Sequence, residues 1–449
     1  MPLKLKFFES TQTSCLLILK SSILKWCYSV LSLASLILLL SNSANAQQLA
    51  FPGAEGYGAY ATGGRGGGVY HVTHLKDSGP GSFRDAVSKP NRTVVFDLSG
   101  VIKIGSRINV ASNVTIAGQT APGEGISIYG NGVSFSKQKN IIVRYIRFRG
   151  SINMSRGSCT VTADSVQNVI LDHVSIEWGR WDNLHIQGSK DVTLQYCLIG
   201  EAIDPQRFGA LLERPERLTI HHCLWIDNQS RNPKAKAKIE YINNVVYNWG
   251  NSGFVGGHSS AHHYQDLINN YFIAGPNSSG SYLSMFAATD HVYHQGNMVD
   301  LNKDGILNGK PVIDSAFKGA SMVAKRQNES PVKVTIQSAA DAYTKVLDEA
   351  GASQKRDAID RRLTSYLRSL GQAGKVFWTE TEAGGHPKIE ELKAQADTDS
   401  DGMPDSWEKT HSLNPGNAAD GNTQVKKSHY TRLEQYLNAI VDSSVQASN

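Results

Sequence analysis

A run of basic side chains stands in one short loop of this 449-residue chain. Arg231, Lys234, Lys236 and Lys238 follow one strand-like segment and precede the next, in the stretch RNPKAKAKIEY. Cations presented on an outward-facing loop can hold an anionic polymer and stabilise negative charge that develops during a reaction. The alternative is a solvated basic loop without a ligand, and the loop by itself does not separate the two.

A group of acids near the C-terminus predicts a metal site. Residues 397–408, DTDSDGMPDSWE, place oxygen side chains at positions 1, 3, 5, 9 and 12 of an EF-hand-like loop and a glycine at position 6. These ligands are Asp397, Asp399, Asp401, Asp405 and Glu408. Hard oxygen ligands favour Ca²⁺ over a transition metal. We expect a structural calcium loop; a solvated acidic turn is the alternative.

The elements that must position these residues repeat along the chain. A short pattern of alternating apolar and polar residues recurs roughly every 25 residues, without helical periodicity between the copies. The copies begin at Asn113, Asn140, Asn168, Asp191, Arg217, Lys238, Asp266 and His291. Such a coil cannot bury its inward face alone, so successive coils must stack. The repeat predicts an all-β fold, a right-handed parallel β-helix.

Stacked coils bring equivalent residues of successive repeats together. The pairs Asn243-Asn244 and Asn269-Asn270 fall at matching places, where asparagine tolerates left-handed turns and can bond along the stack. Cys197 and Cys223 also occupy equivalent positions. We expect them to be free thiols in contact rather than a disulfide, because three cysteines in the mature chain are too few for a disulfide scaffold.

Four segments follow from these patterns. Residues 1–46 read as a signal peptide, with a basic start, an apolar run from Val30 to Leu40 and a small-x-small site ending at Ala46; an uncleaved anchor is the alternative. We expect the β-helix at 47–330, a helical flanking segment at 331–395 and the EF-hand-like module at 396–449. The mature protein should then be secreted, extracellular or periplasmic, without stable membrane insertion.

Composition sets weaker limits. The 41 glycines suit a β fold with many turns, and the net charge of +5 argues only weakly for an anionic partner. We expect a monomer that does not bind nucleic acid.

The chain resembles the pectate lyases of polysaccharide lyase family 1, in their bacterial secreted branch. The matching motifs are His221-His222-Cys223 with Arg231, Pro233 and Lys236, the strand end Ile242-Asn243-Asn244, the box NVILDH from Asn168 to His173, and the segments FPGAEGYGAYATGGRGG and TIAGQTAPGEGI. The resemblance covers roughly residues 50–300.

This resemblance implies β-elimination on α-1,4-polygalacturonate, an acidic plant polysaccharide, or on a related uronate polymer. Arg231 matches the arginine proposed to remove the proton next to the uronate carboxylate, and an electrophilic role beside another base stays open. The resemblance implies that Lys236, Arg207 and Lys234 bind substrate and that Ca²⁺ assists.

The chain departs from the family at the active-site calcium ligands. Ser158 stands where the family has its first aspartate, and Asp182 is the best remaining candidate, ahead of Glu177 and Asp164. These losses keep a non-catalytic polysaccharide-binding β-helix open as an alternative. A polygalacturonase-like hydrolase is another, although no convincing cluster of two or three carboxylates is visible.

Overall fold

A computed structural model describes residues 47–442, so the predicted signal peptide lies outside the described residues. The described residues from Leu49 onward belong to one compact unit. Within residues 47–442, no helix is both long and apolar enough to cross a membrane.

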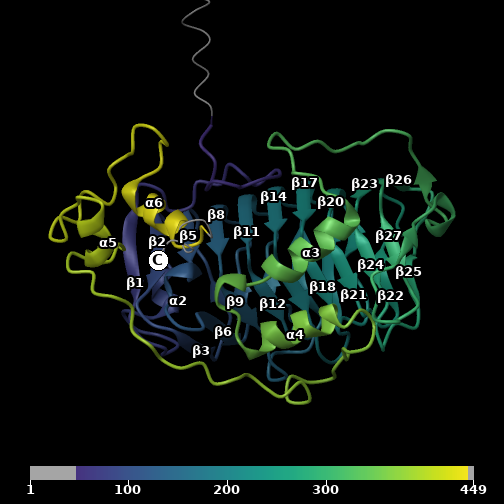
Figure 1. Ribbon diagram of the computed structural model, residues 1–449, viewed down its shortest axis with the longest axis horizontal. Coiled ribbons are helices and arrows are strands. Elements are labelled where there is room, and N and C mark those ends of the chain that lie inside the picture. Colours follow the sequence, from purple (N-terminus) through teal and green to yellow (C-terminus); the bar gives the residue numbers. More distant parts are fainter. Residues whose placement is uncertain (1–46, 443–449) are drawn as a thin grey trace, which may run out of the picture. The chain divides into compact units, whose positions relative to one another are not determined.

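Three sheets of stacked strands build this unit (Figure 1). Sheet A holds eleven strands: β1 Gly68–Val72, β2 Arg92–Phe96, β5 Val114–Ala117, β8 Lys139–Arg144, β11 Gln167–Asp172, β14 Lys190–Gln195, β17 Glu216–His221, β20 Lys238–Ile242, β23 His263–Ile268, β26 Asp290–Gln295 and β29 Ser321–Met322. Sheet B holds eight: β4 Ile108–Asn109, β7 Val133–Ser134, β10 Val161–Thr162, β13 Asp182–Gln187, β16 Phe208–Glu213, β19 Lys234–Lys236, β22 Ser252–Val255 and β25 Ser281–Ser284. Sheet C holds ten: β3 Gly100–Ile104, β6 Ile126–Gly130, β9 Arg147–Arg149, β12 Ser175–Glu177, β15 Leu198–Gly200, β18 Leu224–Ile226, β21 Val245–Tyr247, β24 Tyr271–Ile273, β27 Met298–Asp300 and β28 Lys310–Pro311.

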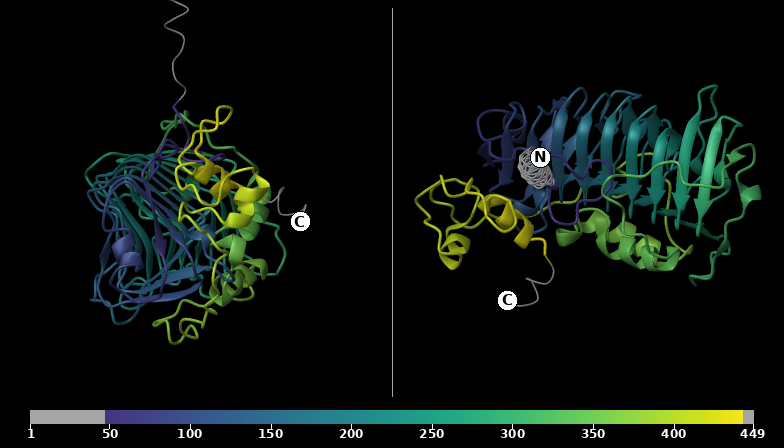
Figure 2. Two further views of the ribbon diagram at one scale, coloured as in Figure 1. Left: turned by 90° about the vertical axis from the view of Figure 1, so that its left-hand side faces the viewer. Right: turned by 90° about the horizontal axis from the view of Figure 1, so that it is seen from above.

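Each coil passes through the three sheets in turn, as in β11, β12 and β13, before β14 pairs in parallel with β11 one rung further along. Side chains that alternate inward, such as Val169, Leu171 and Ile176, fill one continuous apolar interior. Each added coil buries its apolar face against its neighbours, about 4.8 Å away. The expected all-β parallel β-helix is confirmed, and Figure 2 shows the coil from the end and from above.

All copies of the predicted sequence repeat are strands of sheet A. Its eight copies are β5, β8, β11, β14, β17, β20, β23 and β26, which are consecutive neighbours in sheet A. The strands of sheet C between them are mostly three residues long, as in β12 and β15, and such segments carry too little alternation to be recognised in the sequence.

The predicted contacts between equivalent residues of successive coils are present. The Asn244 amide donates to the Asn270 side-chain oxygen at 3.1 Å, and Asn270 donates to Asn297 at 2.8 Å. Asn243 and Asn269 both adopt the left-handed backbone conformation. Cys197 and Cys223 are free and buried, and the Cys197 backbone N–H donates to the Cys223 sulfur at 3.3 Å. Their expected contact as thiols is confirmed.

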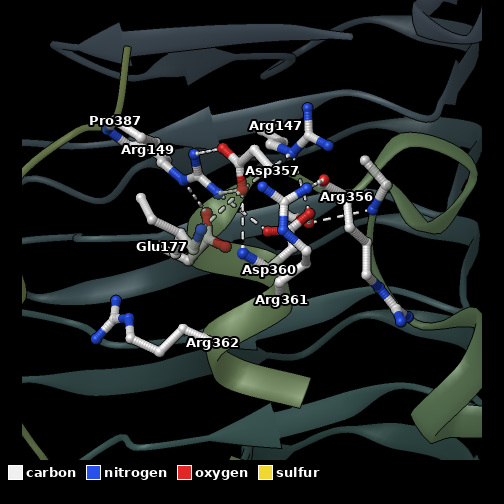
Figure 3. A network of polar contacts seen from close by, with 12 residues as sticks. Arg147, Arg149, Glu177, Arg356, Asp357, Asp360, Arg361, Arg362 and Pro387 are labelled. Carbon is white, nitrogen blue, oxygen red and sulfur yellow. Dashed lines mark hydrogen bonds and ion pairs between the residues drawn. The ribbon is translucent and has the colours of Figure 1, made fainter. Parts of the chain in front are cut away.

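Two helices cover sheet C. Helix α3, Ala339–Glu349, is capped by Ser338, whose hydroxyl accepts from the Asp341 N–H, and α4 spans Ala358–Arg368. Their apolar faces pack on residues such as Leu224 and Tyr247. Beneath α4, Arg149 bridges Glu177 and the two α4 acids Asp357 and Asp360, in a network that is fully buried (Figure 3).

The C-terminal segment returns to the first coils. Helices α5, Asp405–Thr410, and α6, Arg432–Ala439, lie beside β1, β2 and β5 (Figure 1). Met403 and Leu433 pack against Ala117 and Val69, and Arg65 pairs with Glu434 at 2.6 Å. A short helix, α2, Phe83–Ala86, lies between β1 and β2. The predicted boundaries at 330 and 395 stay predictions, since the whole segment belongs to one unit.

Candidate active site

The basic loop enters sheet B, where neighbouring coils supply the site. Asp182 at the start of β13 lies in register with Phe208 of β16, and Phe208 bridges to Ser230, next to Arg231. Further along the same strands, Glu213 is in register with Lys236 of β19. Residues that are far apart in sequence thus share adjacent rungs because each coil repeats the same path.

Arg231 forms the centre of the site. Its Nη1 donates to the two carboxylate oxygens of Asp182 at 3.2 and 3.1 Å, and its guanidinium carbon lies 4.1 Å from the centroid of the Phe208 ring. The Arg231 side chain is 19% exposed, whereas the Asp182 side chain is fully buried. Burial raises the pKa of Asp182 to about 6, against the opposing effects of Arg231 and His185. Arg231 therefore faces solvent from a fixed position.

The two lysines of β19 lie beside Arg231 but differ in their partners. Lys236 Nζ is 3.1 Å from Glu213 Oε1. Lys234 is half-buried, and burial together with the charges of Arg231 and Lys236 lowers its pKa. The site thus holds three cations on one short segment, of which two are paired with acids.

An open cavity of about 320 Å³ lies next to this cluster and is lined by Asp182, His185, Arg107 and Trp181 among others. His185 Nδ1 lies 2.8 Å from Asp164 Oδ1, and this hydrogen bond raises the pKa of His185 against the effect of burial. Trp181 is 36% exposed. Neither Trp181 nor Arg107 was predicted to bind substrate, because neither lies in a recognisable motif.

Arg107 reaches the cavity from two coils away. It precedes β4, yet its guanidinium donates to Thr162 Oγ1 and to the Cys159 carbonyl, both at 3.2 Å, at β10. Asn109, Ser134 and Thr162 are in register on successive rungs, so Arg107 bonds residues that lie two rungs further along the stack. Among residues 47–442 it has no acidic partner within ion-pair distance.

Arg207, the expected substrate-binding residue on the preceding coil, makes different contacts. Its guanidinium carbon lies 3.7 Å from the centroid of the exposed Trp378 ring, and burial lowers its pKa. Arg207 therefore contacts the segment that follows α4 rather than the Arg231–Asp182 pair. Its role in substrate binding stays a prediction.

Asp172 and Glu177 serve other parts of the molecule. Asp172 lies in sheet A, where it bonds Arg144 and His173, each at 2.7 Å, and lines a separate cavity of about 510 Å³. Glu177 belongs to the network under α4.

The donors around Asp182 do not suit a resident calcium ion. Both Asp182 oxygens accept from Arg231, Asp164 bonds His185, and Ser158 supplies only a hydroxyl at the cavity wall. Ca²⁺ takes six to eight oxygen ligands. Within residues 47–442, three acid or histidine ligand atoms come together only in the C-terminal loop. The geometry at Asp182 fits an arginine partner instead.

The C-terminal loop has the donor set that Ca²⁺ prefers. Asp397, Asp399 and Asp401 bring carboxylate oxygens within 4.8 Å of one another, and so do Asp401, Glu408 and Asp420. Both oxygens of the buried Glu408 lack a hydrogen-bond partner, as does one oxygen each of Asp399, Asp401 and Asp420. Gly402, at position 6, has φ of 91°, which a glycine adopts without strain.

Electrostatics in the loop points the same way. Burial and the neighbouring acids raise the pKa values of Asp401 and Glu408 to about 7. A cation would remove this repulsion. The predicted ligand Asp405 instead accepts two hydrogen bonds from Thr398 at 2.8 Å, and Asp420, outside the twelve-residue template, joins the acids. Because Asp420 lies outside the template, the spacing of the loop residues in the sequence could not predict its part in the site.

Fold and site together define a polysaccharide lyase of the parallel β-helix class. The chain is 42% identical to a probable pectate lyase C of Aspergillus flavus over 399 residues, which cover 88% of this chain and 95% of the relative. The same identity and 88% coverage hold for a probable pectate lyase C of Aspergillus fumigatus. This chain belongs to the pectate lyase family.

Two solved structures are more distantly similar to the chain. A pectate lyase from Bacillus sp. N165 in complex with trigalacturonate is 17% identical, with 67% of this chain and 98% of that chain covered and a TM-score of 0.45. A pectate lyase bound to a hexasaccharide has a TM-score of 0.49 at 14% identity, with 70% of this chain and all of that chain covered. No family model matches the chain. Because the relatives with the higher identity are fungal, the bacterial branch stays a prediction.

Proposed function

We propose that this protein cleaves polygalacturonate or a closely related uronate polymer by β-elimination, at the open cavity beside Asp182 in sheet B. The observation that carries the proposal is the partly exposed Arg231, fixed by Asp182 beside an open cavity and two lysines. Cations at two separate places in the sheet, the Arg107 guanidinium beside β10 and Arg231 and Lys236 at β19, suit a polyanion that lies along the stack.

Arg231 is the catalytic residue of this proposal. The proton next to a uronate carboxylate is very weakly acidic, so the enzyme must stabilise the enolate-like charge that forms when it leaves. A guanidinium held by a buried carboxylate keeps its own proton and points a fixed positive charge at the substrate. This supports the electrophilic role for Arg231, while Lys236 and Arg107 neutralise carboxylates of bound sugars.

Calcium belongs to the C-terminal loop in this proposal. Asp397, Asp399, Asp401, Glu408 and Asp420 would hold it, and it would supply a compact positive charge that lets these buried acids ionise together. Since the loop contacts β1 through His71, whose Nε2 is 3.6 Å from Asp397, the ion would fasten the C-terminal segment to the first coils. We further propose a secreted monomer, on the basis of the signal pattern at 1–46.

The test follows the products of polygalacturonate digestion. A lyase produces unsaturated uronate ends that absorb ultraviolet light, a hydrolase produces reducing ends alone, and a binding protein produces neither. We expect Arg231→Ala and Arg231→Lys to lose at least about 100-fold in kcat, on the scale of one lost transition-state donor. Full turnover by both folded variants would remove Arg231 from the reaction.

A further inference from the structure

Two exposed tryptophans from distant parts of the chain lie beside the start of β13 and β16. Trp181 stands directly before β13 and lines the cavity beside Asp182, and it is 36% exposed. Trp378, in the segment that follows α4, is 51% exposed, and its carbonyl accepts from the Asp204 N–H at 2.8 Å. Arg180, next to Trp181, donates to the Asp204 carbonyl at 3.1 Å, so a short chain of hydrogen bonds links the two tryptophans. Their indoles offer flat apolar rings to a ligand.

The ring of Trp378 carries an arginine that no ion pair neutralises. The guanidinium carbon of Arg207 lies 3.7 Å from the centroid of the Trp378 ring, a cation–π contact. Among residues 47–442, Arg207 forms no ion pair, and its Nε has no hydrogen-bond partner. The two acids that act on its charge have other partners: Asp204 pairs with Arg180 at 3.1 Å, and Glu382 accepts from the Trp378 N–H at 3.2 Å. The guanidinium can therefore donate to an anion that binds here.

The main chain fixes both side chains in place. The preceding residue Phe377 is buried, and the N–H and carbonyl of Trp378 are both bonded, to Glu382 at 3.2 Å and to Asp204 at 2.8 Å. The carbonyl of Arg207 accepts from a backbone N–H of the next coil at 2.7 Å. A binding surface that is already ordered loses little conformational entropy when a ligand arrives.

We propose that Trp378 and Arg207 form a uronate-binding wall beside the cavity, an inference that rests on the proposed lyase function. The exposed part of the Trp378 ring packs on the apolar C–H face of one sugar, and the ring holds the Arg207 guanidinium so that it donates to the carboxylate of that sugar. The N–H of Phe208, next to Arg207, donates to the Trp181 carbonyl at 3.1 Å, so the wall continues from the cavity that Trp181 lines. The segment that follows α4 thus belongs to the substrate-binding site.

Kinetics on polygalacturonate tests the wall through KM. Trp378→Ala and Trp378→Leu should each raise KM about tenfold, the scale of one lost ring contact, and should leave kcat within about twofold. Trp378→Phe, which keeps a ring, should stay near the wild-type KM. Trp378→Ala together with Arg207→Ala should raise KM by less than the product of the two single effects, because both side chains act on one sugar. An unchanged KM in both ring-free variants, or effects that multiply, would overturn the wall.

A binding measurement separates this inference from the lyase function. Titration calorimetry of hexagalacturonate with the Arg231→Ala variant, which should not cleave it, gives an affinity that a further Trp378→Ala change should weaken about tenfold. Ile313→Ala removes an apolar side chain that is 63% exposed just after β28 and should change neither KM nor affinity. Thermal unfolding checks that the variants are folded.

The two proposals fail in different ways. Unsaturated products from a wild-type protein, with an affinity for hexagalacturonate that does not depend on Trp378, would overturn the wall alone. A wild-type protein without unsaturated products would overturn the lyase function, and calorimetry would still show whether Trp378 binds the polymer.

Discussion

At the scale of single residues, the basic side chains at β19 differ in their acidic partners, and these partners determine the role that each side chain can have. Three cations, Arg231, Lys234 and Lys236, lie in or just before β19. Asp182 pairs with Arg231 and Glu213 pairs with Lys236, whereas Lys234 has no ion pair among the described residues. Positive charges held in place by such pairs can stabilise negative charge that develops on a substrate beside them.

Arg107 gives a prediction at this scale. If its guanidinium holds a uronate carboxylate in the cavity, Arg107→Ala should raise KM for polygalacturonate about tenfold or more, as expected for a lost charged hydrogen bond, while kcat changes less. Arg107→Lys should recover part of the loss. Steady-state kinetics on de-esterified and methyl-esterified polymer measures this. An equal effect on both polymers would contradict carboxylate recognition, since the ester carries no charge.

The sequence predicted the residues that lie in one contiguous motif. Arg231, Lys234 and Lys236 were found because they share a loop, and the calcium loop because its spacing is fixed by the template. Asp182 was predicted as a calcium ligand, although its surroundings fit Arg231 better. Arg107 and Asp420 reach their sites from distant coils or loops. Only the fold brings such residues together, so no local pattern could reveal them.

At the scale of elements, buried charges attach a helix to the β-helix. Asp357 caps α4 through the backbone N–H groups of Ile359 and Asp360, and it also binds Arg149 (Figure 3). Burial alone would raise the pKa of Asp357, but Arg149 and Arg147 hold it well below its ordinary value. Asp357 thus links the start of α4 to sheet C, beside the contacts of Asp360 and of the apolar face of the helix.

Asp357→Ala should therefore destabilise the protein by about 3–5 kcal/mol, because it leaves Arg149 buried without its full set of partners and removes the cap. Denaturant unfolding measures the loss. The contribution of a carboxylate with a lowered pKa is complete above about pH 4 and disappears in acid, so the deficit should shrink as the pH falls. Glu349→Ala, which breaks the exposed pair with Lys345, should cost less than about 1 kcal/mol. Similar losses in both variants would argue against the network.

Element types were predictable where periodicity was long enough. The strands of sheet A have four or more residues, except at the end of the sheet, and alternate clearly, so the repeat located eight of them. Helix α3 follows local residue types as well, since Ser338 caps its start and Gly351, with a left-handed backbone, follows its end. The ion pairs that hold α4 could not, since Arg149 and Asp357 lie 208 residues apart.

At the scale of the whole molecule, the calcium loop should govern stability. We expect added Ca²⁺ to raise the unfolding temperature of the wild-type protein, with about 2.7 kcal/mol gained at 100 times the dissociation constant, and a chelator to reverse it. Glu408→Gln should abolish the response. Because burial and repulsion raise the pKa of Glu408 to about 7, its ionised form costs stability above that pH.

The metal-free Glu408→Gln variant should therefore be at least as stable as the metal-free wild-type protein at pH 8. Differential scanning calorimetry with and without chelator compares the two. A matched variant, Asp405→Asn, should keep most of the calcium response, since Asp405 bonds Thr398 rather than joining the acid groups. A calcium response that persists in Glu408→Gln would place the ion elsewhere.

The return of the C-terminal segment to the first coils has a further consequence. β1 is the outermost strand of sheet A, and such a strand exposes backbone groups that can pair with another molecule. Asp397 of the calcium loop lies beside His71 of this strand, and Asn422, further along the C-terminal segment, donates to the carbonyl of Gly67 just before it. Release of the ion would then expose the backbone groups of β1 before any coil unfolds. Removal of calcium should therefore first cause self-association of molecules whose remaining coils are still folded.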